Sequence, residues 1–142
     1  MRARDTGEPA MSGKVTLVQE ISADVQAGFL IYVPYYGPHP RSAGADPLPS
    51  SNVGFVYSPF RMKDLMMGIL GPGLPSFRLR IFDRDVMTDQ ALMYDSDPGS
   101  PHSDSAFVER RRIHFGRHFW TFEITSLPPF EKAANSRQSL IV

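Results

Sequence analysis

The sequence has no cysteine and no excess charge of either sign. Without cysteine, disulfide-stapled folds, thiolate nucleophiles and cysteine-based zinc sites are excluded. Among 142 residues, 15 lysines and arginines balance 15 aspartates and glutamates. A nucleic-acid-binding domain shows a clustered basic excess, so we expect no nucleic-acid partner.

Long apolar runs are also absent. The longest is Phe29–Val33, which stops at Pro34, whereas a membrane-spanning helix needs about 18 or more apolar residues. Residues 1–11 are polar and lack the apolar centre of a secretory signal. Residues 140–142 turn apolar at the very end, which fits either a frayed tail or a chain cut where a membrane helix starts.

Aromatic residues and turn formers are plentiful. The chain has 10 phenylalanines, five tyrosines, 13 prolines and 11 glycines. Short β-branched and apolar runs between turn signals predict strands at 15–20, 28–36, 53–57, 77–83, 91–94, 107–115 and 118–125. The continuous apolar run at 28–36 predicts burial on both faces. Gly116-Arg117 predicts a two-residue hairpin turn, and alternation places Trp120, Phe122 and Ile124 on the inner face of the last strand.

One helix is predicted from apolar spacing, at residues 60–70. Gly71 and Pro72 end it, and Met62, Met66 and Met67 are expected to pack in the core. Residues 2–8 resemble a last helical turn closed by Gly7, and a further helix is expected to start near residue 130. Strands beside one main helix predict an α+β fold with an antiparallel sheet, an order typical of small PAS-like modules.

No catalytic or metal-binding constellation stands out. His114 and His118 have a zinc-compatible spacing, but the hairpin puts them on opposite arms and no third ligand accompanies them. Acidic residues from Asp83 to Asp104 are interpreted as solvated loop acids, and the basic triplet 110–112 as a solvated or membrane-facing patch. No phosphate loop or nucleophile elbow occurs. We therefore expect no cofactor, no metal and no enzymatic activity.

Six segments, taken in order, resemble one known family. They are RARDTG at 2–7, GFLIYVPYY at 28–36, GFVYSPFRMKDLMMGIL at 54–70, RLRIFD at 78–83, ALMYDSD at 91–97 and RHFWTFEITSLPPFE at 117–131. Together they resemble a CHASE domain, an extracytoplasmic sensor of membrane-bound histidine kinases and diguanylate cyclases, as in plant cytokinin receptors. The segments 28–36 and 54–70 are the most specific of the six.

The resemblance implies a long helix followed by two PAS-like subdomains. Residues 2–36 would be the C-terminal half of the membrane-distal subdomain, and 37–51 a Pro-rich connecting loop. Residues 52–127 would be the membrane-proximal subdomain, and 128–142 would start the connection to a transmembrane helix that this chain lacks. The long helix and the first half of the distal pocket would also be missing.

Positions matching the family's ligand contacts are Met11, Ser12, Leu17 through its backbone, and Tyr32. Ordinary sheet packing is the alternative explanation for Leu17 and Tyr32. The plant receptors have a smaller threonine at the position of Tyr32, and the larger tyrosine would fill part of a cytokinin-shaped pocket. The resemblance therefore does not imply that cytokinin is the ligand. An unknown small molecule is expected instead.

The resemblance predicts a sensor input module on the periplasmic or extracellular face of the cell membrane. In its parent receptor it would form a homodimer and pass the ligand state to a kinase or cyclase. The main alternative is a ligand-free structural or dimerisation module of a membrane protein. An enzyme such as a hydrolase is a third hypothesis, and the lack of a nucleophile–base pair argues against it.

Overall fold

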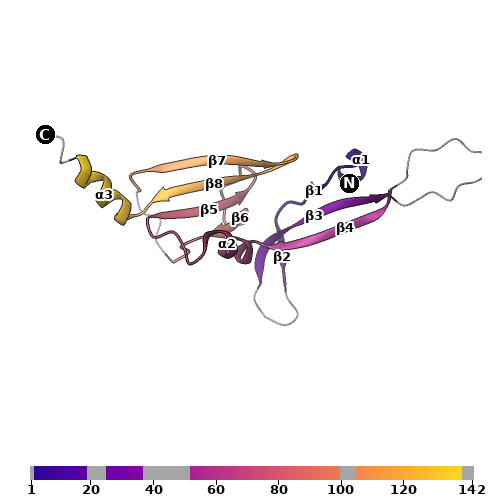
Figure 1. Cartoon of the computed structure of the whole chain (residues 1–142), viewed down its shortest axis with the longest axis horizontal. Coiled ribbons are helices and arrows are strands. Elements are labelled where there is room, and N and C mark those ends of the chain that lie inside the picture. The colour runs from indigo at the N-terminus through magenta and orange to yellow at the C-terminus, as the bar shows by residue number, and fades with distance from the viewer. Residues whose placement is uncertain (1, 19–24, 37–51, 100–104, 139–142) are drawn as a thin grey trace, which may run out of the picture.

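The computed structural model describes residues 2–18, 25–36, 52–99 and 105–138 (Figure 1). Its elements follow one another as α1 (Arg2–Thr6), β1 (Ala10–Met11), β2 (Val15–Leu17), β3 (Gln26–Tyr36), β4 (Asn52–Arg61), α2 (Met62–Leu70), β5 (Phe77–Asp83), β6 (Leu92–Asp95), β7 (Val108–Phe115), β8 (His118–Ser126) and α3 (Pro128–Gln138).

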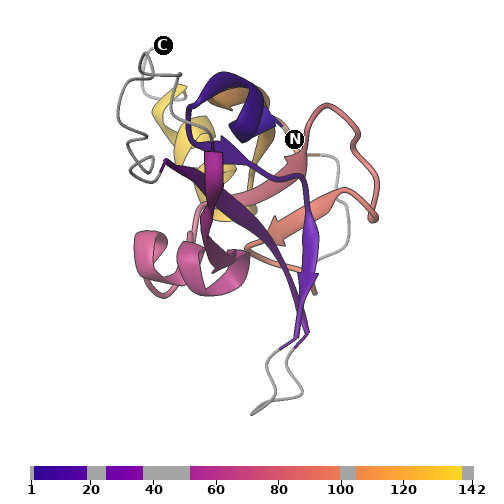
Figure 2. The ribbon, with the colours of Figure 1, turned by 90° about the vertical axis from the view of Figure 1, so that its right-hand side faces the viewer.

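The strands form two antiparallel sheets of four strands each. In sheet A, β3 pairs with β1 and β2 and also with β4; in sheet B the order is β6-β5-β8-β7. Helix α2 follows β4 and lies where the two sheets meet (Figures 1 and 2). The predicted α+β fold with antiparallel sheets is therefore confirmed.

The paired strands β3 and β4 are both longer than the strands predicted at 28–36 and 53–57. They pair continuously from Gly28 opposite Arg61 to Tyr35 opposite Gly54. Strand β4 tolerates Pro59 because, among the described residues, it pairs only with β3, and an edge strand can lack one donor.

Only the first half of β3 is buried or half-buried on both faces, so the prediction of burial is wrong for the second half. Tyr35 is 54% exposed, because this half of the hairpin extends away from α2 and sheet B (Figure 1).

The core lies between the first half of β3, α2 and sheet B. Phe29 on β3 stacks on Phe60 of β4, with ring centroids 5.1 Å apart, and meets the edge of Trp120 of β8 at 4.8 Å. One aromatic ring thus connects the two sheets. The buried residues of this cluster are Phe29, Met62, Met66, Leu79, Ile81, Met93 and Trp120.

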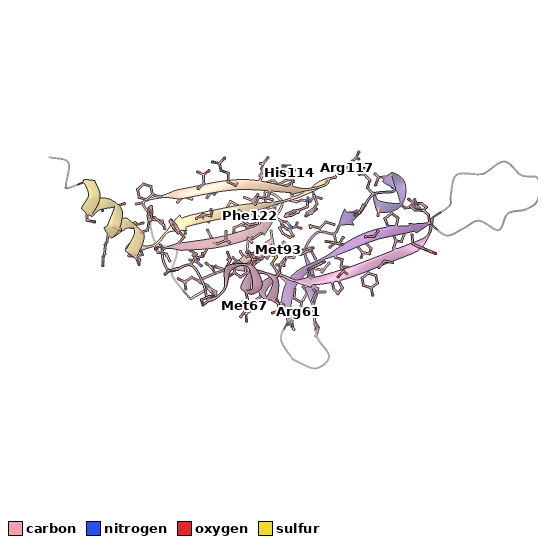
Figure 3. The ribbon with its side chains drawn as sticks, in the orientation of Figure 1. Arg61, Met67, Met93, His114, Arg117 and Phe122 are labelled. Atoms are coloured by element: carbon pink, nitrogen blue, oxygen red, sulfur yellow. The ribbon has the colours of Figure 1, made fainter. Side chains whose placement is uncertain are left out.

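Helix α2 follows the predicted pattern with two exceptions. Phe60 and Arg61, predicted as its first residues, are the last residues of β4, and the helix starts at Met62. Met62 and Met66 are buried and face the core, and Gly71 ends the helix in the left-handed region with φ 67°, its N–H bonded to the carbonyl of Met67. Met67 itself is 57% exposed and points away from the sheets (Figure 3). The expectation that it packs in the core is therefore wrong.

The β7–β8 hairpin confirms the predicted turn but not the whole predicted inner face. Gly116 has φ 60° and Phe115 pairs with His118. Trp120 is buried, yet Ile124 is 38% exposed while Glu123, on the opposite face, is 1% exposed. Helix α2 packs on β3 and β6, at the other edge of sheet B, so it does not cover Ile124.

Glu123 can be buried as a charged group because arginines flank it in a row of alternating charges that crosses sheet B. The strand register aligns Asp95 with Arg80, Arg80 with Glu123, and Glu123 with Arg110. Arg80 and Arg110 both donate to the Glu123 carboxylate, Arg110 at 2.8 Å. Asp95 receives two hydrogen bonds from Arg78, at 2.9 and 2.7 Å.

The arginines keep both carboxylates ionised. Burial raises the pKa of Asp95, but the hydrogen bonds from Arg78 and the Asp97 N–H outweigh it and leave that pKa lowered. Burial likewise raises the pKa of Glu123, and hydrogen bonds from Arg110 and Arg80 outweigh it, so the net shift is downward. Asp95 is therefore not a solvated loop acid, which corrects the sequence interpretation.

Helix α3 begins at Pro128, close to the helix start predicted near residue 130. Proline fits the first helical turn because the N–H it lacks has no partner there anyway. Glu131 accepts hydrogen bonds from the Ser126 hydroxyl and the Ala106 N–H, and Phe130 packs on Phe77 at 4.8 Å. These contacts fix the start of α3 against the end of sheet B.

The domain boundaries predicted around residues 37–51 stay predictions, and that loop lies outside the described residues. His39, His102 and the apolar residues 140–142 also lie outside the described residues.

Phe29→Ala is expected to lower the free energy of unfolding by about 3–5 kcal/mol, the usual cost of removing a buried phenylalanine. Urea unfolding followed by tryptophan fluorescence measures it, since Trp120 touches the ring. Tyr35→Ala is the matched control, because it lies on the same strand and is exposed. Equal losses in the two variants would contradict the assigned core.

Stability is expected to fall as the pH drops below about 4, near the ordinary pKa of aspartate and glutamate. Lowered pKa values in the folded state mean that Asp95 and Glu123 stabilise the fold above that pH, and that this contribution is lost as they take up protons. Urea unfolding between pH 7 and 3 measures the slope.

Glu123→Gln should flatten that slope, and Glu109→Gln should leave it unchanged because the Glu109 carboxylate is mostly exposed beside Arg111. If both variants kept the wild-type slope, the buried charge row would have no part in acid unfolding.

Candidate functional site

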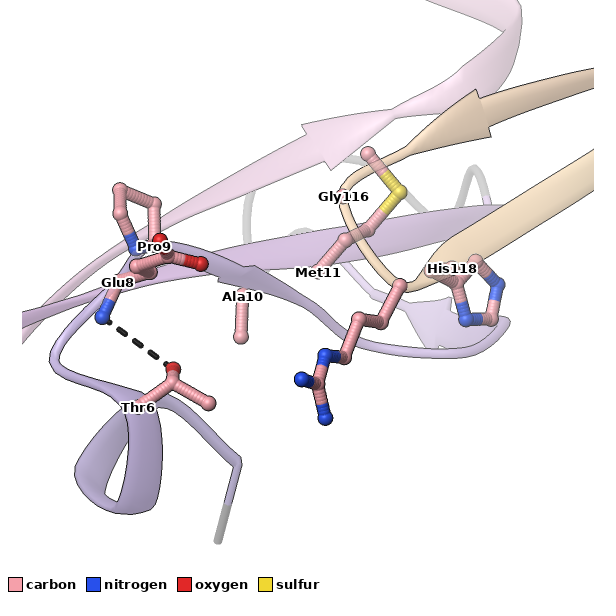
Figure 4. A pocket seen from close by; sticks show the side chains of 8 residues that line it. Thr6, Glu8, Pro9, Ala10, Met11, Gly116 and His118 are labelled. Atoms are coloured by element: carbon pink, nitrogen blue, oxygen red, sulfur yellow. Dashed lines mark hydrogen bonds between the residues drawn. The ribbon is translucent and has the colours of Figure 1, made fainter.

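A small groove lies between the N-terminal segment and the β7–β8 turn. It has a volume of about 50 Å³ and its two walls belong to different sheets (Figure 4). Residues from α1 through β1 form one wall, and the turn with the first residue of β8 forms the other. The lining residues are Thr6, Glu8, Pro9, Ala10, Met11, Gly116, Arg117 and His118.

Local sequence sets both walls. Gly7 closes α1 as predicted, with φ 72° and its N–H bonded to the Ala3 carbonyl at 3.0 Å. Only a residue that tolerates this left-handed conformation lets the chain turn from α1 into β1. On the other wall, Gly116 takes φ 60° and reverses the chain within two residues, which brings His118 to the groove.

A buried histidine–aspartate pair lies at the base of this wall. The side chain of His118 is 4% exposed, and its Nε2 lies 2.6 Å from Oδ1 of Asp83, at the end of β5. The other Asp83 oxygen accepts the Lys14 backbone N–H at 2.9 Å. One carboxylate therefore connects the β1–β2 segment of sheet A with two strands of sheet B.

The backbone next to this pair is strained. Arg84 has φ 61° and is the only described residue other than glycine with a positive φ, a conformation that costs of order 1–3 kcal/mol. Its N–H bonds to the Phe119 carbonyl at 3.2 Å and its carbonyl accepts the Thr121 hydroxyl. Strand β8 thus holds Arg84 in place beside the aspartate.

The four residues predicted to contact a ligand do not share one face. Met11 lines the groove and pairs with Ile31. The Ser12 hydroxyl accepts the Leu30 N–H at 2.9 Å and donates to the Gly13 carbonyl at 2.7 Å, so it extends the sheet ladder.

Leu17 lies toward the start of β3, whereas Tyr32 lies one residue pair from Met11. Leu17 pairs with Gln26 and Tyr32 pairs with Ala10. Because side chains alternate along a strand, Tyr32 and Met11 project from opposite faces, and the Tyr32 ring lies 6.1 Å from that of Tyr57. These four ligand contacts stay a prediction.

Nothing in the described part of the chain forms a metal cluster. No group of three or more histidine or acidic side chains converges there. His114 and His118 lie on opposite strands of the hairpin, as expected. Asp83 is not a solvated acid, because it bonds to His118 and Lys14, which corrects its interpretation as a loop acid.

The basic triplet is held by carboxylates on the solvent-exposed strand β7. Arg110 bonds to Glu123 at 2.8 Å, Arg111 to Glu109 at 2.6 Å, and Arg112 lies 3.8 Å from Asp85. The side chains of all three arginines are more than half exposed. A solvated face, one of the two alternatives from the sequence, describes this arrangement.

A second groove lies at the other end of sheet B. Its volume is about 450 Å³, and it is mostly apolar, with exposed Phe107, Val108 and Ile124 beside Phe130. It touches the start of α3.

The Asp83–His118 pair was missed by the sequence analysis, although the element boundaries around it were nearly right. The two residues are 35 positions apart, and only the pairing of β5 with β8 brings them together. The usable signal was that Asp83 ends one strand and His118 begins another, since antiparallel neighbours place the end of one beside the start of the other.

Asp83→Ala is expected to destabilise the fold by about 1–3 kcal/mol, because it leaves the Lys14 N–H and the buried His118 ring without their acceptor. Amide hydrogen exchange should show lost protection at Lys14, and urea unfolding measures the energy. Asp85→Ala is the matched control, because this carboxylate is exposed. Unchanged exchange at Lys14 in the Asp83 variant would refute the link.

Comparison with known proteins supports the resemblance found in the sequence. No curated protein matches the chain. The sequence model of the CHASE domain matches residues 1–94, from α1 into β6, and so covers the N-terminal wall of the groove and most of the core cluster. The resemblance was expected to reach residue 131, whereas the match ends before β7. With more than half of its length matched, the chain belongs to the CHASE domain family.

Proposed function

We propose that this chain is the small-molecule sensing part of a membrane-bound receptor and passes its ligand state to a kinase or cyclase output. CHASE domains are extracytoplasmic sensory domains of receptors and are not catalytic, which supports a sensor on the periplasmic or extracellular face of the membrane. In the part of the chain that the structure describes, no helix is both long and apolar enough to span a bilayer.

The observation that carries this proposal is the direct bonding of the β1–β2 segment to sheet B. Besides its backbone bond to Asp83, Lys14 donates from Nζ to the Gln90 carbonyl at 2.7 Å. The predicted ligand contacts Met11 and Ser12 lie shortly before Lys14 in the chain. A ligand that displaces this segment would therefore pull on the loop and strand ends of sheet B.

Strand β8 offers a route from there to the C-terminal helix. It begins at His118, beside the groove, and ends at Ser126, whose hydroxyl bonds to Glu131 of α3. Figure 1 shows α3 at the end of sheet B away from α1. A change in the position of β8 would move the start of α3, and a ligand that prefers one of two such arrangements shifts the population toward it.

The parent receptor is proposed to act as a homodimer, with residues 2–36 in a membrane-distal and 52–127 in a membrane-proximal subdomain. Residues 128–142 would lead toward a transmembrane helix. Met11, Ser12, Leu17 and Tyr32 remain the proposed ligand contacts.

A second candidate function is that of a ligand-free dimerisation module. The apolar groove of about 450 Å³ favours it, because Phe107 and Val108 are more than half exposed, and exposed apolar patches mark interaction sites. Light scattering during gel filtration, combined with the ligand screen below, distinguishes the two: a stable dimer that Phe107→Ser dissociates, in a chain that no compound of the library stabilises, would support this alternative.

The sensor proposal is tested by thermal unfolding of the full chain against a library of small metabolites. A true ligand at 100 times its dissociation constant should add about 2.7 kcal/mol to the free energy of unfolding, which raises the melting temperature by several degrees. Hydrogen exchange at Lys14 and in β8 should slow in the presence of that ligand. A library without any stabilising compound would contradict the proposal and favour the dimerisation module.

A further inference from the structure

We infer that the groove between the N-terminal segment and the β7–β8 turn binds a small α-amino acid as a zwitterion, with the ligand carboxylate at Arg117 and its ammonium group at Glu8. This deepens the proposed function, on which it rests, by naming a site and a ligand class.

The groove carries one free charge of each sign, on opposite walls. Glu8 lies on the N-terminal wall and Arg117 at the tip of the β7–β8 turn, where Figure 3 labels it. Both side chains are exposed, and within the described residues neither the Glu8 carboxylate nor the Arg117 guanidinium has an ion-pair partner. The other described arginines of the hairpin, Arg110–Arg112, all lie beside carboxylates.

The buried histidine adds a directional group. Because the Asp83 carboxylate can only accept, the Nε2 of His118 carries a proton in their 2.6 Å hydrogen bond. The Nδ1 atom makes no hydrogen bond within the described residues, and the ring forms part of the groove wall (Figure 4). In this tautomer Nδ1 carries a lone pair, so it can accept an N–H of a ligand and does not bind its carboxylate.

These charges favour a zwitterion over a simple anion or cation. An isolated carboxylate would meet Glu8, and an isolated ammonium would meet Arg117, so each would gain one ion pair and face one like charge. A molecule with both groups satisfies both walls. An arginine can bind a carboxylate with two parallel hydrogen bonds, which makes it the natural partner for that end.

The size and the apolar part of the groove limit the ligand further. The groove offers about 50 Å³, less than the room of two water molecules at about 30 Å³ each in the liquid. It is open on one side, so it encloses only part of even the smallest amino acid and the rest of the ligand stays in solvent. Pro9, Ala10 and Met11 form the apolar part of the lining. The ligand class is therefore an amino acid with a very small side chain, such as glycine or L-alanine.

Such a ligand would bridge two parts of the fold. Glu8 moves with α1 and β1, whereas Arg117 and His118 belong to sheet B. Bound between them, the amino acid would add a contact parallel to the Asp83–Lys14 hydrogen bond and would hold the two walls together. That is the kind of differential contact a two-state sensor requires.

The test is isothermal titration of the full chain with glycine and L-alanine, and with acetate and ethylamine as half-ligands. We expect the amino acids to bind at least about tenfold more tightly than either half-ligand. Arg117→Gln and Glu8→Gln should each weaken amino-acid binding by about tenfold or more, the usual effect of losing a charge-assisted hydrogen bond.

Arg111→Gln and Glu109→Gln are the matched controls, because these exposed residues pair with each other on β7, outside the lining of the groove. They should bind like the wild type, and all four variants should keep its melting temperature. No binding of either amino acid, or binding that Arg117→Gln and Glu8→Gln leave unchanged, overturns the inference. If the metabolite library yields a different ligand, the inference fails while the sensor proposal stands; if it yields none, both fail.

Discussion

The packing of Phe29 between Phe60 and Trp120 is the contact on which the rest of the structure depends. It is where β3, the longest strand described, meets both the end of β4, just before α2, and the central strand β8 of sheet B. Without that contact the apolar core shared by the two sheets would lose its central ring pair, and the groove whose walls belong to different sheets would be held less firmly. The free energy of burying one aromatic ring therefore supports the geometry of the site.

Hydrogen bonds then fix the relative positions of the segments that the apolar core brings together. Asp83 bonds to Lys14 on one side and His118 on the other, so the N-terminal segment cannot shift along sheet B without breaking a buried hydrogen bond. The positive φ of Arg84 beside it indicates that contacts with the surrounding strands hold this residue in a strained backbone conformation. Strained backbone of this kind clusters at ligand sites and switch regions, which agrees with a sensory role for a CHASE domain.

How far the sequence predicted the fold depended on whether a pattern was local. Helix α2, its Gly71 cap, the Gly116 turn and most strands were anticipated, because periodicity and glycine placement act within a few residues. The errors concern burial: Met67 and Ile124 are exposed and the Asp95 side chain is largely buried. Each depends on which element covers a given face, and α2 covers only one side of sheet B. Of the groove, only Met11 had been singled out as a candidate ligand contact, and the Asp83–His118 pair had not been anticipated.

The sequence by itself determined the α+β class, the family and the absence of cysteine chemistry, since these follow from composition and from ordered local motifs. Only the tertiary structure decided which charges meet. Arg80 joins Glu123 across 43 positions, and Lys14 joins Asp83 across 69. Such pairs arise from strand register, which is set by the joint packing of all strands and the core, and no short stretch of sequence encodes it.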